Sequence, residues 1–373
     1  MISQSRVVIV NCFDTYEHRV ELLKQYFTDL GSQVDIFTSD WRHFHKTVRT
    51  DCPDGYTLVH AKPYYKNLSV SRLLSHDQFA KDALSAAEKM NPHLIWVLVP
   101  PNSLVKAAEL YKKKNPNVNI VLDFIDMWPE TMPISKFKQY PPFSFWRDLR
   151  DKHLHFADAL VTECALYRTL LEKNYPADRI HTVYLARHIQ PIALGCNLSD
   201  DKISLCYLGS INNIIDIPCI GEIIRSIQMP VDLHIIGDGE KRHELIETAE
   251  TAGAHVIFHG KVYDSDKKKA ILDQCHFGLN IMKPSVFVGL TMKSMDYFEY
   301  GLPLINNIAG DTWEFIEKND IGINYKPSYG LDTQQLLKIS HNRQSVRQFF
   351  EENFSYESFC RSVENILAEN NCL

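Results

Sequence analysis

The segment Val286–Pro303, which reads VFVGLTMKSMDYFEYGLP, holds the densest set of residues suited to an anionic ligand. An apolar run at 278–282 predicts a strand, a loop with Gly289 and Leu290 follows, and a helix is expected to begin near Thr291. The first N–H groups of a helix have no intrahelical acceptor, and together with the helix dipole they favour a phosphate. Lys293 in the first turn adds a full positive charge, so the segment predicts a phosphate-binding site.

Two acids follow in the same predicted helix. Asp296 and Glu299 are three residues apart and therefore lie roughly on one face. A carboxylate at this place can accept both hydroxyls of a ribose, while Gly301 and Pro303 end the helix. A surface helix with solvated charges would explain any one of these residues alone, but the segment as a whole favours a nucleotide site.

A second group of acids lies at Asp123–Glu130, which reads DFIDMWPE. A buried strand is expected to end there in three carboxylates, with a tryptophan and a proline shaping the loop. Strand-end carboxylates that face a cleft suit binding or proton handling. Asp126 is the candidate catalytic group and acceptor contact, with Trp128 and Glu130 as further acceptor contacts. The alternative is a capping loop without a ligand.

The stretch Tyr140–Phe156 interleaves aromatic residues with Arg147 and Arg150. Basic and aromatic residues together suit an anionic bilayer surface or a lipid-diphosphate acceptor. An ordinary amphipathic helix with its aromatics packed inward is the alternative. Nucleic acid is not expected, because the formal net charge is −6 and no nucleic-acid module is visible.

Three weaker signals carry no site. The turn Gly237–Gly239 begins a dinucleotide fingerprint but lacks its third glycine and its strand-end acid. Asp264-Ser-Asp266 matches a metal-binding triplet and is better interpreted as a helix N-cap. His43 and His45 have no clustered acid or cysteine, so we expect a surface strand or loop. The nine cysteines form no CxxC pair, which favours reduced thiols and no zinc site.

Short apolar runs alternate with helical patterns along all 373 residues, which predicts parallel sheets covered by helices on both faces. The expected strands are Val7–Val10, Val34–Thr38, Leu58–Ala61, Leu94–Val99, Ile120–Ile125, Ala159–Thr162, Thr182–Leu185, Ile203–Leu208, Val231–Ile236, His255–Phe258, Gly278–Met282, Leu304–Asn307 and Gly322–Tyr325. Seven strands followed by six predict two Rossmann-like, doubly wound α/β domains facing across a cleft, with ligands at the carboxyl ends of the strands. We expect an acceptor domain at 1–195, a nucleotide domain at 196–345 and a helical tail at 346–373 that packs back on the first domain.

The charges of the two halves differ. Residues 1–195 hold 24 lysines and arginines against 21 acids, and the remainder holds 16 against 25. No run of about 20 apolar residues exists, and the N-terminus lacks the features of a secretory signal. We therefore expect a cytoplasmic protein, with peripheral binding to the inner membrane surface as a further expectation.

In the order of its motifs, the chain resembles retaining GT-B glycosyltransferases of family 4. That family carries two glutamates eight positions apart, with a glycine five positions after the second. Counting back from Gly301 places Asp296 at the second acid and Val288 at the first, so the first acid is missing. Lys293, three positions before Asp296, matches the bacterial surface-polysaccharide subgroup.

Further motifs of the resemblance fall in the family's order. Leu205–Ser210 resembles the first strand of the nucleotide domain, although Asn212 and Asn213 follow where a basic pair is common. Leu233–Glu240 resembles the second strand with its glycine turn, and Ile257–Val262 the strand whose end holds the nucleobase. Phe354–Glu357 resembles the motif of the closing tail, and Asp123–Glu130 resembles the Asp-Leu-Trp-Pro-Glu-Ser motif of the subgroup.

The resemblance implies transfer of a hexosyl or N-acetylhexosaminyl group, with retention, from a UDP-linked donor to a glycan or polyprenyl-diphosphate-linked acceptor in bacterial capsule or exopolysaccharide synthesis. Lys293 would also serve catalysis, and no metal or other cofactor is expected. The donor-binding set is Gly209, Ser210, Gly237, Lys261, Val262, Gly289, Leu290, Thr291, Lys293, Asp296 and Glu299. The acceptor-binding set is Asp126, Trp128, Glu130, Arg147 and Arg150. The alternatives are a non-catalytic GT-B subunit of a glycosyltransferase complex and a nucleotide-sugar epimerase.

Overall fold

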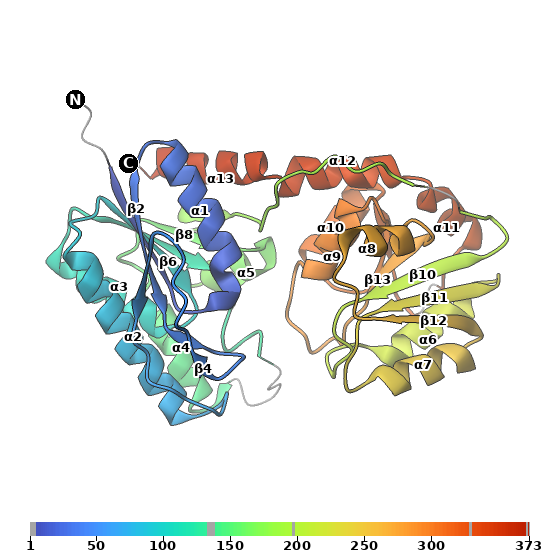
Figure 1. The fold of residues 1–373 in the computed structure, drawn as a ribbon, viewed down its shortest axis with the longest axis horizontal. Coiled ribbons are helices and arrows are strands. Elements are labelled where there is room, and N and C mark those ends of the chain that lie inside the picture. Colours follow the sequence, from blue (N-terminus) through green and yellow to red (C-terminus); the bar gives the residue numbers. More distant parts are fainter. Residues whose placement is uncertain (1–4, 133–138, 196–197, 328–329, 371, 373) are drawn as a thin grey trace. The chain divides into compact units, whose positions relative to one another are not determined.

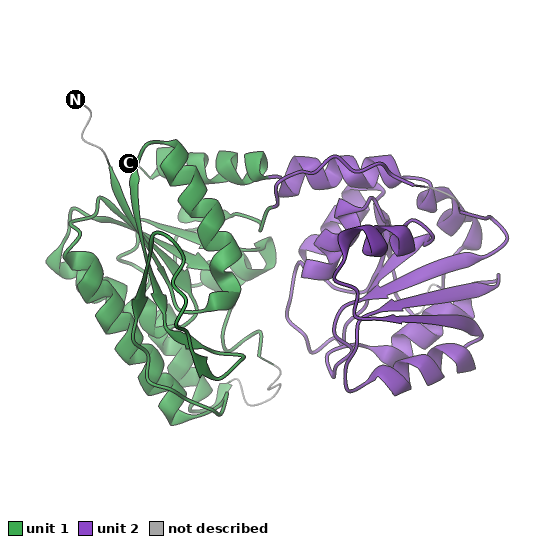
Figure 2. Ribbon diagram, viewed as in Figure 1, with its two compact units in different colours: residues 1–186, 356–373 green, residues 187–355 purple. Residues whose placement is uncertain are grey.

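The computed structural model describes residues 5–132, 139–195, 198–327, 330–370 and 372. The chain folds into two compact units, coloured separately in Figure 2. Unit 1 comprises residues 1–186 and 356–373, and unit 2 comprises residues 187–355.

Unit 1 is built on a parallel sheet with the strand order β5-β2-β1-β6-β7-β8-β9. Its strands are β1 (Arg6–Asn11), β2 (Gln33–Ser39), β5 (Tyr56–Val59), β6 (Leu94–Val99), β7 (Asn119–Phe124), β8 (Ala159–Thr162) and β9 (Ile180–Thr182). The central strand β6 reads LIWVLV and is buried throughout, because helices cover both faces of the sheet. A small antiparallel pair, β3 (Trp41–Arg42) and β4 (Thr47–Val48), was not predicted.

The helices of unit 1 cover both faces of this sheet (Figure 1). They are α1 (Glu17–Asp29), α2 (Val70–Glu88), α3 (Ser103–Lys114), α4 (Phe143–Asp151), α5 (Ala165–Leu171) and α13 (Tyr356–Glu369), with short 3-10 turns η1 (Asp14–Tyr16) and η3 (Ala177–Arg179). One core joins α1 and α13 to alternate strand residues such as Val7, Ile9 and Trp96. The period of two along each strand sends the other residues to the face covered by α2 and α3.

Unit 2 repeats this plan with the strand order β12-β11-β10-β13-β14-β15, again parallel. Its strands are β10 (Ile203–Leu208), β11 (Val231–Ile236), β12 (Ala254–Gly260), β13 (Phe277–Asn280), β14 (Leu304–Asn306) and β15 (Gly322–Asn324). Its helices are α6 (Ile217–Ser226), α7 (Arg242–Thr251), α8 (Ser265–Leu272), α9 (Met292–Glu299), α10 (Asp311–Asn319), α11 (Thr333–Ser340) and α12 (Arg343–Phe354). Isoleucines and leucines of α6, α7 and α11 share one core with β10 and β11.

The chain changes unit nine residues before the expected linker boundary of 195/196 and ten residues after the expected tail boundary of 345/346. The expected tail is divided, because α12 packs on α9 of unit 2 through Phe298, Phe349 and Phe354, whereas α13 belongs to the core of unit 1. The chain crosses between units twice, and the two crossing segments pair where Arg187 meets Ser355.

Each strand expected from the sequence has a counterpart in the structure, and the two Rossmann-like sheets confirm the predicted fold class. The largest shifts are at the edges of the first sheet, where β5 and β9 each begin two residues early. Within the described ranges, no helix is both long and apolar enough to cross a bilayer.

Candidate functional site

Two glycines shape the carboxyl edge of the unit 2 sheet. Gly237 follows β11 with φ at 141°, and a Cβ atom built there would lie 1.9 Å from the carbonyl oxygen of Gly209. Only glycine fits at this close approach. Gly209 follows β10 with φ at 118°, and a Cβ built on it would meet open space. The backbone of the loop after β10 therefore packs closely against Gly237. The space beside the Cα atom of Gly209 is open, so a ligand can approach the loop there.

The predicted phosphate loop is held by polar contacts at both ends. Thr291 caps α9, and its Oγ1 accepts from the N–H of Ser294 at 3.1 Å and contacts Asn280 Oδ1 at 2.9 Å. The carbonyl of Gly289 accepts from the N–H and the hydroxyl of Thr312, at 2.9 and 2.8 Å. These bonds position the N-terminus of α9 beside β13.

Asn280 is also the first member of a ladder of three asparagines, of which Asn280 and Asn306 are fully buried. Asn280, Asn306 and Asn324 are in register across β13, β14 and β15. Each side-chain amide donates to the next carbonyl oxygen, at 2.8 and 2.9 Å. Because a buried amide without partners is costly, this ladder stabilises the strand ends on which the loop rests.

Lys293 lies in the first turn of α9, and its Nζ is 4.7 Å from the ring centroid of Tyr207. The hydroxyl of Tyr207 donates to the carbonyl of Ser210 at 2.8 Å, so one tyrosine joins the lysine to the β10 loop. Lys293 forms no ion pair with any residue that the structure describes. Burial lowers its pKa from 10.5 to about 8, because its ammonium has lost water without gaining a counter-charge. A ligand phosphate would supply that charge.

Asp296 and Glu299 do lie on one face of α9, and both bind Arg187. Arg187 Nη1 is 2.9 Å from Asp296 Oδ1 and also contacts Glu299 Oε2. These are the two acids expected at the ribose. In the structure both carboxylates form ion pairs with Arg187, the first residue of unit 2.

The remaining expected donor residues take their places at the same edge. Lys261 and Val262 directly follow β12, with Lys261 exposed and Val262 partly exposed, and Leu290 lies in the loop before α9.

In unit 1, Asp126 and Trp128 follow β7 as expected and contact each other. Trp128 Nε1 donates to Asp126 Oδ2 at 2.6 Å. Burial raises the pKa of Asp126, although this hydrogen bond opposes the shift. Asp123 has a different role, since Arg19 donates to both its oxygens at 2.7 and 2.9 Å in a fully buried ion pair.

Glu163 is a candidate that the sequence analysis missed. It directly follows β8, the neighbour of β7, and so ends on the same sheet edge as Asp126. Burial raises its pKa from 4.5 to about 7, with Asp123 and Asp126 adding to the rise and Arg19 opposing it. The sequence did offer a signal for Glu163, because it is an acid that directly follows a second expected strand, Ala159–Thr162. Two carboxyls with raised pKa at one edge suit proton transfer near neutral pH.

Arg150 does not meet the expectation of a headgroup contact. Its side chain is 1% exposed and pairs with Glu130 at 2.9 Å and with Asp151 at 2.7 Å. It also donates to the carbonyl of Trp128 at 3.2 Å. Arg150 and Glu130 therefore fix the loop after β7, and of the two expected basic contacts in α4 only Arg147 retains a partly exposed side chain.

The aromatic residues around α4 fit neither the membrane-contact expectation nor the inward-packed alternative as a whole. Trp146 is buried, as an inward-packed helix requires, whereas Tyr140 and Phe145 are 63% and 62% exposed.

His43 lies in the turn between β3 and β4 but is buried, contrary to expectation, and its Nδ1 contacts the hydroxyl of Tyr64 at 2.8 Å. Asp264 caps α8 as predicted, because its side chain accepts from the N–H of Lys267 at 2.8 Å. Across the described ranges, no cluster of three or more histidine, cysteine or acidic side chains could hold a metal ion.

Comparison with known proteins bears on both units. Residues 203–331, most of unit 2, match the family described as Glycosyl transferases group 1. No curated protein sequence matches the chain. Among solved structures, the chain is similar to the apo form of the lipopolysaccharide outer core galactosyltransferase WaaB, with a TM-score of 0.69 at 12% identity over 98% of this chain and 99% of that one.

Two further structures show the same likeness at 12% identity over 98% of this chain. Sucrose-phosphate synthase from Thermosynechococcus elongatus gives a TM-score of 0.69 over 99% of its length. Anabaena HepE in complex with UDP gives 0.66 over its whole length. At such identity these likenesses establish the fold. The chain thus has the GT-B fold, and residues 203–331 of its second unit match group 1 glycosyl transferases.

Proposed function

We propose that this protein is a glycosyltransferase that takes a hexosyl or N-acetylhexosaminyl group from a UDP-linked donor. The acceptor is a glycan or a polyprenyl-diphosphate-linked glycan, and the setting is bacterial capsule or exopolysaccharide synthesis at the cytoplasmic face of the inner membrane. The match of residues 203–331 to group 1 glycosyl transferases supports the reaction class. The structure of Anabaena HepE with UDP supports the choice of nucleotide.

The single observation that carries the donor site is Lys293, a desolvated ammonium without a carboxylate partner among the described residues, at the capped N-terminus of α9. In the proposal the diphosphate lies between this ammonium and the loop at Gly209. As the glycosidic bond breaks, negative charge grows on the leaving diphosphate. Lys293 and the N–H groups near Thr291 stabilise that charge without a metal.

Asp296 is proposed to accept the ribose hydroxyls, in exchange for part of its contact with Arg187. The acceptor is proposed to lie at the carboxyl edge of the unit 1 sheet, near Asp126, Trp128 and Glu163. The reaction is proposed to retain the anomeric configuration, as in the family that the chain resembles.

Calorimetry with UDP, in the presence and absence of a chelator, tests the donor site. We expect UDP to bind equally in both, and Lys293→Gln to weaken binding by about 10- to 100-fold, the range for a charge-assisted hydrogen bond. Lys338→Gln is the matched control, because it removes an exposed charge from α11 of the same unit. Binding that disappears with the chelator contradicts the metal-free site.

A second candidate, a non-catalytic subunit of a glycosyltransferase complex, is favoured by two departures from the family's motifs. Val288 occupies the position of the first family acid, and Asn212 and Asn213 replace the basic pair. Incubation with a panel of UDP-sugars separates the possibilities. Release of UDP with a sugar product of retained configuration by NMR supports the transferase. Exchange of sugar configuration on an intact donor identifies an epimerase, and UDP binding without turnover favours the subunit.

A further inference from the structure

Arg72 is a buried cation without an ion-pair partner among the described residues. It lies in the first turn of α2, and its side chain is 3% exposed. Its guanidinium donates to the carbonyl of Asn67 at 2.7 Å and interacts with the neutral hydroxyl of Tyr64. Nε and Nη2 are buried and have no hydrogen-bond partner. An unpaired buried charge costs several kcal/mol, so its retention calls for a ligand or a compensating contact.

Aromatic rings supply part of that compensation. The guanidinium lies over Trp128 at 4.4 Å, and the rings of Trp146 and Tyr64 are 5.7 and 5.9 Å away. Such contacts stabilise a cation by about 0.5–2 kcal/mol each, so the three rings offset part of the cost of burying the charge unpaired. Further positive potential comes from Lys46 and from the N-terminus of α2, where Ser69 caps the helix. The surroundings of Arg72 therefore favour an anion.

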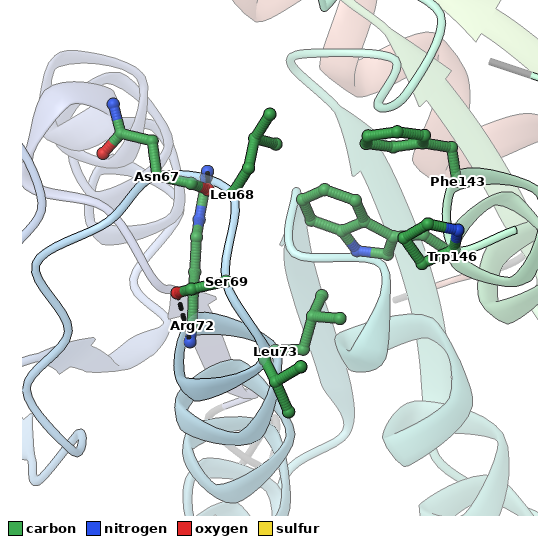
Figure 3. A pocket seen from close by; sticks show the side chains of 9 residues that line it. Asn67, Leu68, Ser69, Arg72, Leu73, Phe143 and Trp146 are labelled. Atoms are coloured by element: carbon green, nitrogen blue, oxygen red, sulfur yellow. Dashed lines mark hydrogen bonds between the residues drawn. The ribbon is translucent and has the colours of Figure 1, made fainter. Parts of the chain in front are cut away.

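Arg72 also lines a pocket of about 210 Å³, with apolar walls. Figure 3 shows Leu68, Arg72 and Leu73 on one side of this pocket, facing Phe143 and Trp146 on the other. Leu68 and Val70 line this pocket and are 55% and 71% exposed, so they mark its opening to the surface. Leu74 on α2 is a further exposed apolar side chain, at 60%. The pocket thus combines one buried cation with an apolar wall that extends to the surface.

Trp128 connects this pocket to the strand-end acids. Its indole N–H donates to Asp126, and the face of the same ring lies against the guanidinium of Arg72. A group bound at Arg72 is therefore separated from the candidate acid by a single side chain.

We propose that this pocket binds the acceptor through a phosphate group carried on an apolar chain, with Arg72 donating to the phosphate and the apolar wall holding the first part of the chain. The assignment as acceptor rests on the proposed function. Arginine suits this role, because its planar donors match phosphate oxygens and remain charged when buried. The exposed side chains of Leu68 and Val70 provide the exit for a long chain.

Calorimetry on the full chain, with farnesyl phosphate, farnesol and inorganic phosphate below the micellar concentration, tests the proposal. We expect farnesyl phosphate to bind at least about tenfold more tightly than either part alone. Arg72→Gln should remove this advantage over farnesol. Equal affinity of the wild type for farnesyl phosphate and farnesol would overturn the role of the charge, and equal affinity for inorganic phosphate would overturn the role of the apolar wall.

A second variant keeps the test independent of folding, since Arg72→Gln alters a buried residue. Val70→Asp places a negative charge at the exposed mouth of the pocket and should weaken farnesyl phosphate binding about tenfold. Leu110→Asp on α3, 48% exposed and outside this pocket, is its control and should have no effect. Equal weakening by both changes would contradict the proposal. UDP binding, measured on the same samples, tests the proposed donor site separately, because all three substitutions lie in unit 1.

Discussion

The charge state of Lys293 should make nucleotide affinity depend on pH. Its pKa is about 8 in the free protein, so the ammonium is mostly present at pH 7 and mostly lost at pH 9. A bound diphosphate favours the charged form and raises the pKa. If binding restores the ordinary value of 10.5, the dissociation constant for UDP rises about tenfold between pH 7 and pH 9. The direction follows from linkage, since the complex then holds a proton that the free protein has released.

Calorimetry at pH 7, 8 and 9, in buffers of different ionisation enthalpy, measures both the affinity and the proton taken up. Uptake should be small at pH 7 and approach one proton per UDP at pH 9. Lys293→Arg keeps its charge throughout this range and should show a flatter profile, which also corrects for titration of UDP itself. An identical pH profile in Lys293→Arg, or no proton uptake by the wild type at pH 9, would refute the assignment of a desolvated lysine at the diphosphate.

Three further outcomes follow from the contacts described above. Asp296→Asn should weaken UDP binding by about 1–3 kcal/mol, measured by calorimetry. Glu299→Gln removes a contact with the same Arg187 and should leave UDP binding unchanged. Equal effects of the two changes would mean that the ion pair with Arg187, and not a contact from Asp296 to the ribose, supports binding. Gly237→Ala should lower the free energy of unfolding in urea by more than about 3 kcal/mol, because its Cβ would overlap a backbone carbonyl, and a normal value would mean that the two loops separate easily. Glu163→Gln should raise the melting temperature at pH 8 and leave it nearly unchanged at pH 4, below the ordinary pKa of this acid. The wild type loses stability as pH rises from about 4.5 to about 7, where burial opposes ionisation of this acid, so a constant difference across pH would contradict that burial.

Local patterns in the sequence were enough to predict the alternation of strands and helices, the two parallel sheets and the N-terminus of α9. These features depend on neighbours in the chain. Apolar runs such as Ile203–Leu208 form strands buried on both faces, and Thr291 caps the helix that it precedes. For the same reason the strand-end residues Gly209 and Asp126 could be placed at the carboxyl edges of their sheets.

The partners of the charged side chains were decided by the tertiary structure alone. Arg150, expected at a membrane surface, is buried against Glu130, twenty positions away in the chain. Nothing in the sequence marked Arg72 as a binding residue. It is shielded from water by the rings of Trp128 and Trp146, which lie more than fifty positions away in the chain. The division of the expected tail between α12 and α13 was equally hidden, since both segments are amphipathic helices and only their packing partners differ. The periodicity of a segment predicts which of its side chains are buried. Whether a buried charge is stable depends on the counter-charge that the fold places beside it, and this partner can come from anywhere in the chain.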